Sequence, residues 1–140
     1  MNVYLDASVL VALVIQDVFS DRALAFLSAE TPALLLSDYA EAEFASAIAR
    51  RVRMNEITRR QAQRAFAALD QWAPRETTPV ETMTSDVAAA AAFVRRLDLP
   101  LRTPDVLNIA IARRMAATLA TFDARMASNA EALGVAVAKI

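Results

Sequence analysis

The sequence predicts an α/β fold in which helices cover both faces of a short parallel sheet. Short apolar runs that suit buried strands, such as Asn2–Leu5 and Ala33–Leu36, alternate with longer segments of helical periodicity. This alternation is typical of parallel strands joined by crossover helices. The length of 140 residues fits one domain. We therefore expect a three-layer α/β/α arrangement around a central parallel sheet of about five strands.

Local patterns define each element in turn. We expect strands at residues 2–5, 33–36, 77–81, 118–121 and 135–138, and helices at about residues 8–15, 22–29, 37–54, 58–72, 85–97, 103–115 and 123–134. Thr31-Pro32 is expected to end the second helix, and Pro74 and Pro79 bracket the third strand. Gly134, the only glycine, lies where the last helix needs a C-terminal cap.

The composition excludes several kinds of site chemistry. The chain has no His and no Cys, which excludes an imidazole base, a thiol nucleophile and a thiolate zinc site. One glycine cannot build a glycine-rich phosphate loop. Carboxylate clusters that hold a hard metal ion remain as the main catalytic route.

The charge balance limits what surfaces are expected. The chain has 15 basic and 16 acidic residues, which argues against a strongly electropositive coat but allows a local patch. Asp6 interrupts the first apolar stretch, and no run of about 18 uncharged apolar residues exists, so we expect neither a signal peptide nor a membrane helix. A cytoplasmic protein without membrane contact is the expectation.

Several acidic residues have local structural explanations when each is taken alone. Asp6 and Asp123 follow predicted strands, where each can cap the next helix. Asp38 and Glu41 have the spacing of a capping box. Asp105 follows Thr103-Pro104, which suits a helix start with Thr as the cap. The carboxyl ends of parallel strands are also where binding sites form, so both interpretations stay open.

Glu43 has no such capping explanation. It lies inside the helix predicted at 37–54, past the first turn and beside the apolar face of Phe44 and Ile48. A carboxylate in these surroundings needs a partner or a metal ion. A surface contact with Arg50 or Arg51 is the simpler alternative.

Four stretches together resemble the PIN-domain ribonucleases, and among them the VapC-type toxins of type II toxin–antitoxin systems. They are Val3-Tyr4-Leu5-Asp6-Ala7-Ser8, Glu43-Phe44-Ala45-Ser46-Ala47-Ile48, Thr103-Pro104-Asp105-Val106-Leu107-Asn108-Ile109-Ala110 and Leu119-Ala120-Thr121-Phe122-Asp123. The resemblance covers nearly the whole chain and implies a single PIN domain over residues 1–140.

The resemblance implies an acidic site and a metal cofactor. The matching acids, taken as both catalytic and metal-binding, are Asp6, Glu43, Asp105 and Asp123, supported by the hydroxyls of Ser8 and Thr121. Glu41, two residues before Glu43, is the alternative candidate for the glutamate of this site. Oxygen ligands favour Mg²⁺ or Mn²⁺. We expect Asp6 and Asp105 closest to the metal, with the other acids partly acting through water or a second ion.

The implied activity is cleavage of RNA phosphodiester bonds. Arg50, Arg51 and Arg53, with Arg59, Arg60 and Arg64 nearby, could contact RNA phosphates, although a solvated helix face would have the same pattern. The resemblance also implies a homodimer and a cognate antitoxin protein that neutralises the toxin.

Two other functions fit parts of the sequence. A catalytically inactive PIN-fold binding or regulatory module would keep the acids as helix caps. A phosphohydrolase with an aspartate nucleophile would need Asp-x-Asp at the first strand and a later lysine. Ser8 occupies the second of those positions, and Lys139 is the only lysine.

Overall fold

The structure, a computed structural model, describes residues 1–29 and 32–140. Within these residues, four strands form one sheet: β1 (Asn2–Leu5), β2 (Ala33–Ser37), β3 (Thr77–Val80) and β4 (Thr118–Ala120). Their order is β3-β2-β1-β4, and every neighbouring pair is parallel. The predicted α/β class with a central parallel sheet is confirmed. The Thr31-Pro32 pair was expected to end the second helix, and Thr31 lies outside the described residues.

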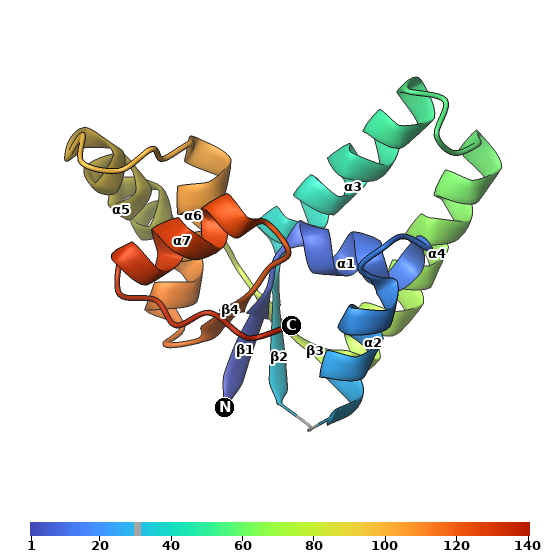
Figure 1. The fold of residues 1–140 in the computed structure, drawn as a ribbon, viewed down its shortest axis with the longest axis horizontal. Helices are drawn as coiled ribbons and strands as arrows, with labels where there is room; N and C mark the ends of the chain where they lie inside the picture. Colours follow the sequence, from blue (N-terminus) through green and yellow to red (C-terminus); the bar gives the residue numbers. More distant parts are fainter. Residues whose placement is uncertain (30–31) are drawn as a thin grey trace.

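The helices form two arms that rise from the sheet. They are α1 (Ala7–Val14), α2 (Ser20–Ala29), α3 (Asp38–Arg53), α4 (Arg59–Glu76), α5 (Thr84–Arg95), α6 (Thr103–Arg114) and α7 (Ala124–Ala132). In Figure 1, α3 and α4 form one arm, and α5, α6 and α7 form the other. The strands converge between the arms with their carboxyl ends directed toward the gap, so residues that follow the strands lie at its base.

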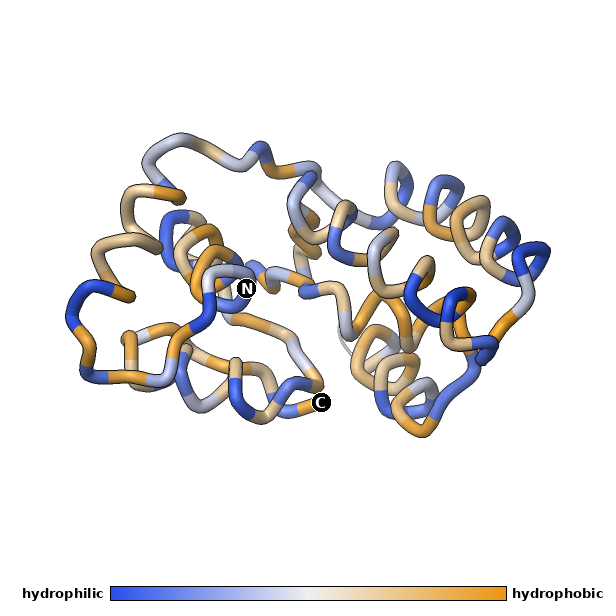
Figure 2. Tube along the Cα trace, turned by 90° about the horizontal axis from the view of Figure 1, so that it is seen from above, coloured by the Kyte–Doolittle hydropathy of each residue, from blue (hydrophilic) through white to orange (hydrophobic). Residues whose placement is uncertain are grey.

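Each face of the sheet packs against its own core. Successive strand side chains point to opposite faces, so Val3 and Leu5 pack with α1, α3 and α4 while Tyr4 packs with α5, α6 and α7. Figure 2 shows apolar stretches in the helices of both arms. Since β1 is buried on both faces, the side chain that follows Leu5 is held in a rigid setting. None of the described helices is both long and apolar enough to cross a bilayer.

Two predicted helix boundaries are wrong. Helix α4 continues through Pro74 to Glu76, because Pro74 lies in its last turn on an exposed position where the hydrogen bond lost to the ring costs little. Ser37, not Asp38, caps α3: its hydroxyl accepts a hydrogen bond from the Ala40 N–H at 2.9 Å. The Asp38 carboxylate instead accepts hydrogen bonds from the backbone and hydroxyl of Thr82.

The expected fifth strand is reduced to a single bridge. Val137 pairs with Leu119 of β4, with hydrogen bonds from Leu119 N to Ala136 O and from Ala138 N to Leu119 O, each 2.8 Å. Gly134 precedes this segment with φ +79°, as expected for a glycine that ends a helix. The segment thus covers the edge of β4 without extending the sheet.

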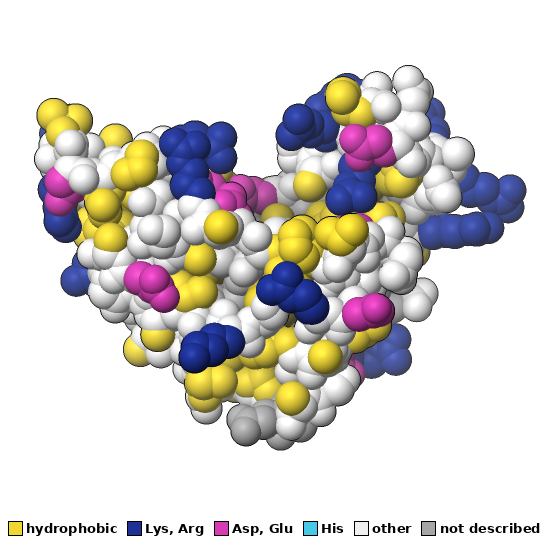
Figure 3. Space-filling view, viewed as in Figure 1, with side chains coloured by type: hydrophobic (Ala, Val, Ile, Leu, Met, Phe, Trp, Pro, Cys, Tyr) yellow, Lys and Arg dark blue, Asp and Glu magenta, His cyan; other side chains and the backbone are white. Residues whose placement is uncertain are grey.

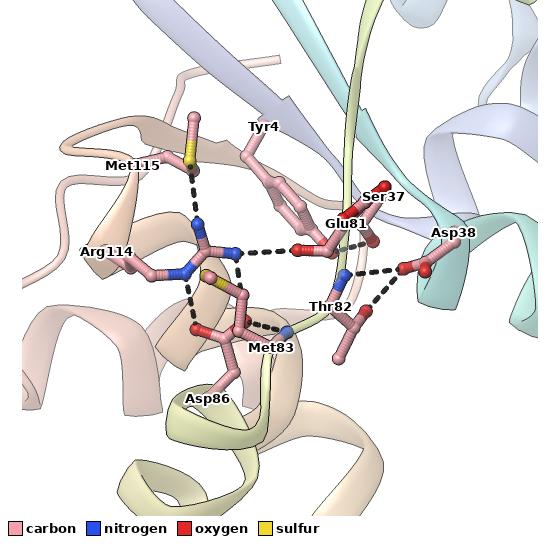
Figure 4. A network of polar contacts seen from close by, with 9 residues as sticks. All are labelled: Tyr4, Ser37, Asp38, Glu81, Thr82, Met83, Asp86, Arg114 and Met115. Carbon is pink, nitrogen blue, oxygen red and sulfur yellow. Dashed lines mark hydrogen bonds and ion pairs between the residues drawn. The ribbon is translucent and has the colours of Figure 1, made fainter.

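An ion pair between the buried Asp86 and the partly exposed Arg114 joins α5 to the C-terminal end of α6. Arg114 donates from Nε to Asp86 Oδ1 at 2.7 Å and from Nη2 to Asp86 Oδ2 at 2.9 Å (Figure 4). Arg114 Nη2 also donates to the Glu81 carbonyl, and the Met83 N–H donates to Asp86. These bonds fix the position of α6, the helix that carries Asp105.

Candidate active site

Asp6 stands at the carboxyl end of the central strand and is buried, with 3% of its surface exposed. Its Oδ1 accepts hydrogen bonds from the Ser8 hydroxyl at 2.6 Å and from the Val9 N–H at 3.2 Å, the second of which caps α1. Its Oδ2 accepts from the Thr121 hydroxyl at 2.6 Å. Burial raises the pKa of Asp6, and the hydrogen bonds from Ser8 and Thr121 act against that rise.

The two predicted supporting hydroxyls therefore contact Asp6 directly. They also join the ends of β1 and β4. The Ser8 hydroxyl accepts from the Phe122 N–H at 2.9 Å, and the Thr121 hydroxyl accepts from the Asp123 N–H at 3.0 Å. Both oxygens accept from backbone, so their protons are free to be donated to Asp6.

Glu43 lies half-buried on α3 and is bound by an amide, not by arginine. Asn108 Nδ2 donates to Glu43 Oε1 at 2.5 Å. Within the described part of the chain, neither Arg50 nor Arg51 forms an ion pair with Glu43, so the alternative of a surface contact is not present. Arg51 instead pairs with Asp17, with 3.6 Å between Nη2 and Oδ2.

Asp105 is a buried carboxylate that does not act as a helix cap. It lies in the first turn of α6 and is 5% exposed. Arg102, not Thr103, occupies the N-cap position, and no side chain caps the helix there. Asp105 Oδ2 is buried and has no hydrogen-bond partner among the described residues. The exposed Arg102 forms an ion pair with this oxygen, with 3.5 Å between Nε and Oδ2, but donates no hydrogen bond to it.

Three of the four predicted acids lie close enough to act on one another electrostatically. Burial raises the pKa of Glu43, the Asn108 hydrogen bond lowers it, and the charges of Asp6 and Asp105 raise it further. A carboxyl group whose pKa is raised by neighbouring carboxylates lies in a region of negative potential. The space-filling view shows acidic side chains at the base of the hollow between the two arms (Figure 3).

Asp123 is joined to this group through Thr121 and caps α7. Its Oδ1 accepts from the Arg125 N–H at 2.9 Å and from the Met126 N–H at 3.1 Å. The capping role considered for Asp123 is therefore present. Its backbone N–H and the Asp6 carboxylate bind the same Thr121 hydroxyl.

Glu41 faces a different part of the molecule. It is exposed, and its pKa is raised by partial burial and then by the charges of Asp70 and Asp38. Neither of these is among the acids around Glu43. Of the two candidate glutamates, Glu43 is the one that the fold places beside Asp6 and Asp105.

Comparison with known proteins identifies the family. Residues 3–132 match the family model of the PIN domain. The chain belongs to the PIN domain family. Comparison with curated protein sequences gave no match.

Solved structures with low sequence identity share the fold of this PIN domain. VapC20 of Mycobacterium tuberculosis, described as a sarcin–ricin loop cleaving toxin, is 18% identical with a TM-score of 0.76, over 99% of each chain. FitAcB of Neisseria gonorrhoeae is 19% identical with a TM-score of 0.71, over 98% of this chain and 96% of its own. VapBC2 of Rickettsia felis bound to promoter DNA is 13% identical with a TM-score of 0.71, over 99% and 98%.

Three polar residues near the acids were not predicted as part of the site. Asn108, Tyr4 and Ser37 form a hydrogen-bonded chain that ends on Glu43. Asn108 was visible in the sequence as a polar residue within the apolar run of α6, three positions after Asp105. Tyr4 and Ser37 gave no comparable signal, since both have ordinary roles in a strand or a cap.

The donor set of this PIN domain suits a hard divalent cation. All the candidate ligands are carboxylate oxygens. Asp105 Oδ2 is buried without a hydrogen bond and pairs only at 3.5 Å with the exposed Arg102 among the described residues, so a bound cation would stabilise it further. Across residues 1–29 and 32–140, no three acidic side chains form a ready-made metal cluster. Mg²⁺ is commonly held directly by one or two carboxylates, with water completing its shell. Direct binding by all four acids stays a prediction.

Proposed function

We propose that this protein is a Mg²⁺- or Mn²⁺-dependent endoribonuclease and the toxin of a toxin–antitoxin pair. In this proposal, residues 1–140 form a single PIN domain that acts in the cytoplasm as a homodimer. The family and the fold support the nuclease class, and the similar structures include toxins and toxin–antitoxin complexes.

The observation that carries the proposal is the buried Oδ2 of Asp105, beside Asp6 and Glu43. Among the described residues this oxygen accepts no hydrogen bond, and its ion-pair partner is the exposed Arg102. A charged oxygen removed from water without a hydrogen bond destabilises the fold. Helix capping does not explain Asp105, because its carboxylate does not cap α6, although its first-turn position suits the helix dipole. A cation-binding role accounts for its burial and for its neighbours.

Asp6, Glu43, Asp105 and Asp123 would hold the cation. Once bound, a divalent cation makes water easier to deprotonate and offsets negative charge on the phosphodiester. Ser8 and Thr121 keep the Asp6 carboxylate in one orientation by donating to its two oxygens. Arg102, exposed beside Asp105, is placed to attract the phosphate of an incoming substrate.

RNA would approach along the basic side chains around α3 and α4. Arg50 and Arg53 lie exposed in the last turn of α3, while Arg51 forms an ion pair with Asp17. Figure 3 shows basic side chains on both arms that border the hollow. Phosphate contacts of this kind give affinity without sequence choice.

The proposed antitoxin is inferred from similar complexes. FitAB bound to DNA, 18% identical with a TM-score of 0.74, and VapBC2 each contain a protein of this fold assembled with its partner. We expect a co-expressed antitoxin to relieve growth arrest caused by this chain.

The test is cleavage of a mixed RNA substrate by the purified protein. We expect cleavage with Mg²⁺ or Mn²⁺, none after EDTA, and a loss of ~100-fold or more in Asp105→Asn, on the scale of removing a charge-stabilising group from an active site. Asp21→Asn is the matched control, because Asp21 also lies in the first turn of a helix but is exposed. Cleavage that survives EDTA, or an equal loss in both variants, would refute the proposal. A folded protein without any cleavage would favour the inactive binding module.

A further inference from the structure

A fully buried asparagine connects Glu43 to the interior of the protein. Asn108 is 1% exposed and lies on α6 among apolar neighbours. Its side-chain amide makes three hydrogen bonds. Nδ2 donates to Glu43 Oε1 at 2.5 Å and to the Pro104 carbonyl at 3.0 Å, and Oδ1 accepts from the Tyr4 hydroxyl at 2.7 Å.

The orientation of this amide is fixed by its partners. A backbone carbonyl can only accept, so the nitrogen of Asn108 must face Pro104. Its second proton then points to Glu43, and its oxygen meets the Tyr4 hydroxyl. Rotating the amide by half a turn would place oxygen against both the Pro104 carbonyl and the Glu43 carboxylate, which is repulsive.

The series of hydrogen bonds that begins at Glu43 continues through Asn108 and Tyr4 to Ser37, at the start of α3. The Ser37 and Tyr4 hydroxyls are 2.6 Å apart, and Tyr4 donates its proton to Asn108. Ser37 must therefore donate to Tyr4, while its oxygen accepts from the Ala40 N–H. This series of hydrogen bonds begins and ends at α3, at its N-cap Ser37 and at Glu43. Its middle members are Tyr4 on β1 and Asn108 on α6.

Packing alone does not account for a polar residue here. The neighbours Val106, Leu107 and Ile109 are apolar and buried. An apolar side chain at 108 would fill the same space without removing an amide from water. What an apolar side chain cannot do is bind one chosen oxygen of Glu43.

We infer that Asn108 is a positioning residue that holds Glu43 Oε1 so that Oε2 is presented to the divalent cation of the site. Among the described residues, none donates a hydrogen bond to Glu43 Oε2. The inference rests on the proposed metal-dependent function, and it adds a residue that acts on the cation through Glu43. Partners of metal ligands in this position usually set ligand orientation.

The test is Mn²⁺ binding to the full chain, measured by calorimetry without RNA. We expect Asn108→Leu to weaken binding about 10- to 100-fold, the usual effect of losing a hydrogen-bond partner of a metal ligand. Asn129→Leu is the matched control, since Asn129 is also buried and donates to a proline carbonyl, that of Pro100, away from Glu43. We expect its affinity to equal that of the wild-type protein.

A double-mutant cycle separates positioning from packing. In the Glu43→Gln background, Asn108→Leu is expected to cause no further loss of affinity, because its effect passes through the Glu43 carboxylate. The same fold-loss in both backgrounds, or unchanged affinity in Asn108→Leu, would overturn the inference and leave the proposed function standing. Absence of Mn²⁺ binding to the wild-type protein would overturn both.

A measurement on the wild-type protein covers the case in which Asn108→Leu does not fold. The side-chain amide signals of Asn108 in a ¹H–¹⁵N spectrum are expected to shift on addition of Mg²⁺, and those of Asn129 are not. Asn108 signals that do not respond to saturating Mg²⁺ would overturn the inference.

Discussion

Arg114→Met tests how strongly the ion pair between Arg114 and the buried Asp86 holds α5 and α6 together. The change keeps the apolar stem of the side chain and removes both bonds to Asp86, which is 2% exposed. Asp86 is then left as a buried carboxylate that accepts one hydrogen bond, from the Met83 N–H at 2.8 Å. Removing one partner of a buried pair costs about 3–5 kcal/mol. Because the Arg114 side chain is 28% exposed, water can enter the space it leaves, and we expect a loss near the lower limit, about 3 kcal/mol.

The loss should depend on pH in a defined direction. Burial acts to raise the pKa of Asp86, but the Arg114 and Met83 hydrogen bonds outweigh it, so the pKa is lowered. A lowered carboxyl pKa contributes stability above the unfolded value of about 3.9 and loses it as pH falls through the folded value. In Arg114→Met the pKa of Asp86 rises instead. The difference in free energy of unfolding between the wild-type protein and Arg114→Met should therefore be largest near neutral pH and become smaller below about pH 4.

The assay is urea unfolding followed by circular dichroism at pH 7 and at pH 3. In a separate thermal unfolding experiment at pH 7, the melting temperature of Arg114→Met should be roughly 10 °C below that of the wild-type protein. Arg96→Met is the matched control, because its pair with Asp98 is as short, 2.6 Å, but about half-exposed, and should contribute only about 0.2–1 kcal/mol. Equal losses in the two variants, or a loss in Arg114→Met that is the same at both pH values, would refute the reasoning.

Three further predictions concern the site, the basic surface and the end of the last helix. Burial, reinforced by the charges of two nearby aspartates, raises the pKa of Glu43, so ionisation costs stability as pH rises. Glu43→Gln should increase the free energy of unfolding at pH 7 by about 0.5–2 kcal/mol in urea titrations without metal, and a decrease would contradict this. Replacing Arg50 and Arg53 together by Gln should weaken RNA binding in metal-free filter assays and reduce the slope against log salt by about 1–2. Replacing the exposed Arg75 by Gln should have little effect on RNA binding. An equal loss of RNA binding in the Arg75 variant would count against a dedicated RNA-binding surface at Arg50 and Arg53. Gly134→Ala should lower stability by about 1 kcal/mol in thermal unfolding, since φ is +79° with open space around the new Cβ, and an unchanged melting temperature would exclude backbone strain there.

Elements buried on both faces could be predicted well from the sequence. Asn2–Leu5 forms β1 with the expected bounds, because continuous apolar runs have few other uses in an α/β fold. Pro74 was misread because the cost of a proline depends on where in the helix it falls, and its place in an exposed last turn depends on tertiary packing. The segment at 135–138 has strand-like residues but pairs only at Val137, and such pairing is not encoded locally.

The candidate site could be predicted in part. The resemblance to PIN-domain ribonucleases implied Asp6, Glu43 and Asp105 as site residues, and the fold brings Asp6 and Asp105 within electrostatic reach of Glu43. The local motif at Thr103-Pro104 indicated a cap one residue too late, since Arg102 occupies the N-cap position and Asp105 lies in the first turn. Asn108 was missed as a site residue because its importance comes from Glu43, 65 positions earlier in the chain. Its place in an apolar run marks Asn108 as unusual, but the partner that gives it a role cannot be read from the local sequence.

The central place of β1 has a consequence for how the protein is made. Val3 pairs on one edge with Leu34 and on the other with Thr118, so the strand near the start of the described chain is enclosed by one near its end. The Asp6–Thr121 hydrogen bond spans 115 positions. A ribosome-bound chain that has not yet exposed residues 118–121 lacks both the last strand and the hydroxyl that orients Asp6. The acidic site therefore cannot form before residues 118–121 have left the ribosome, and such long-range pairings favour slow folding over early local assembly.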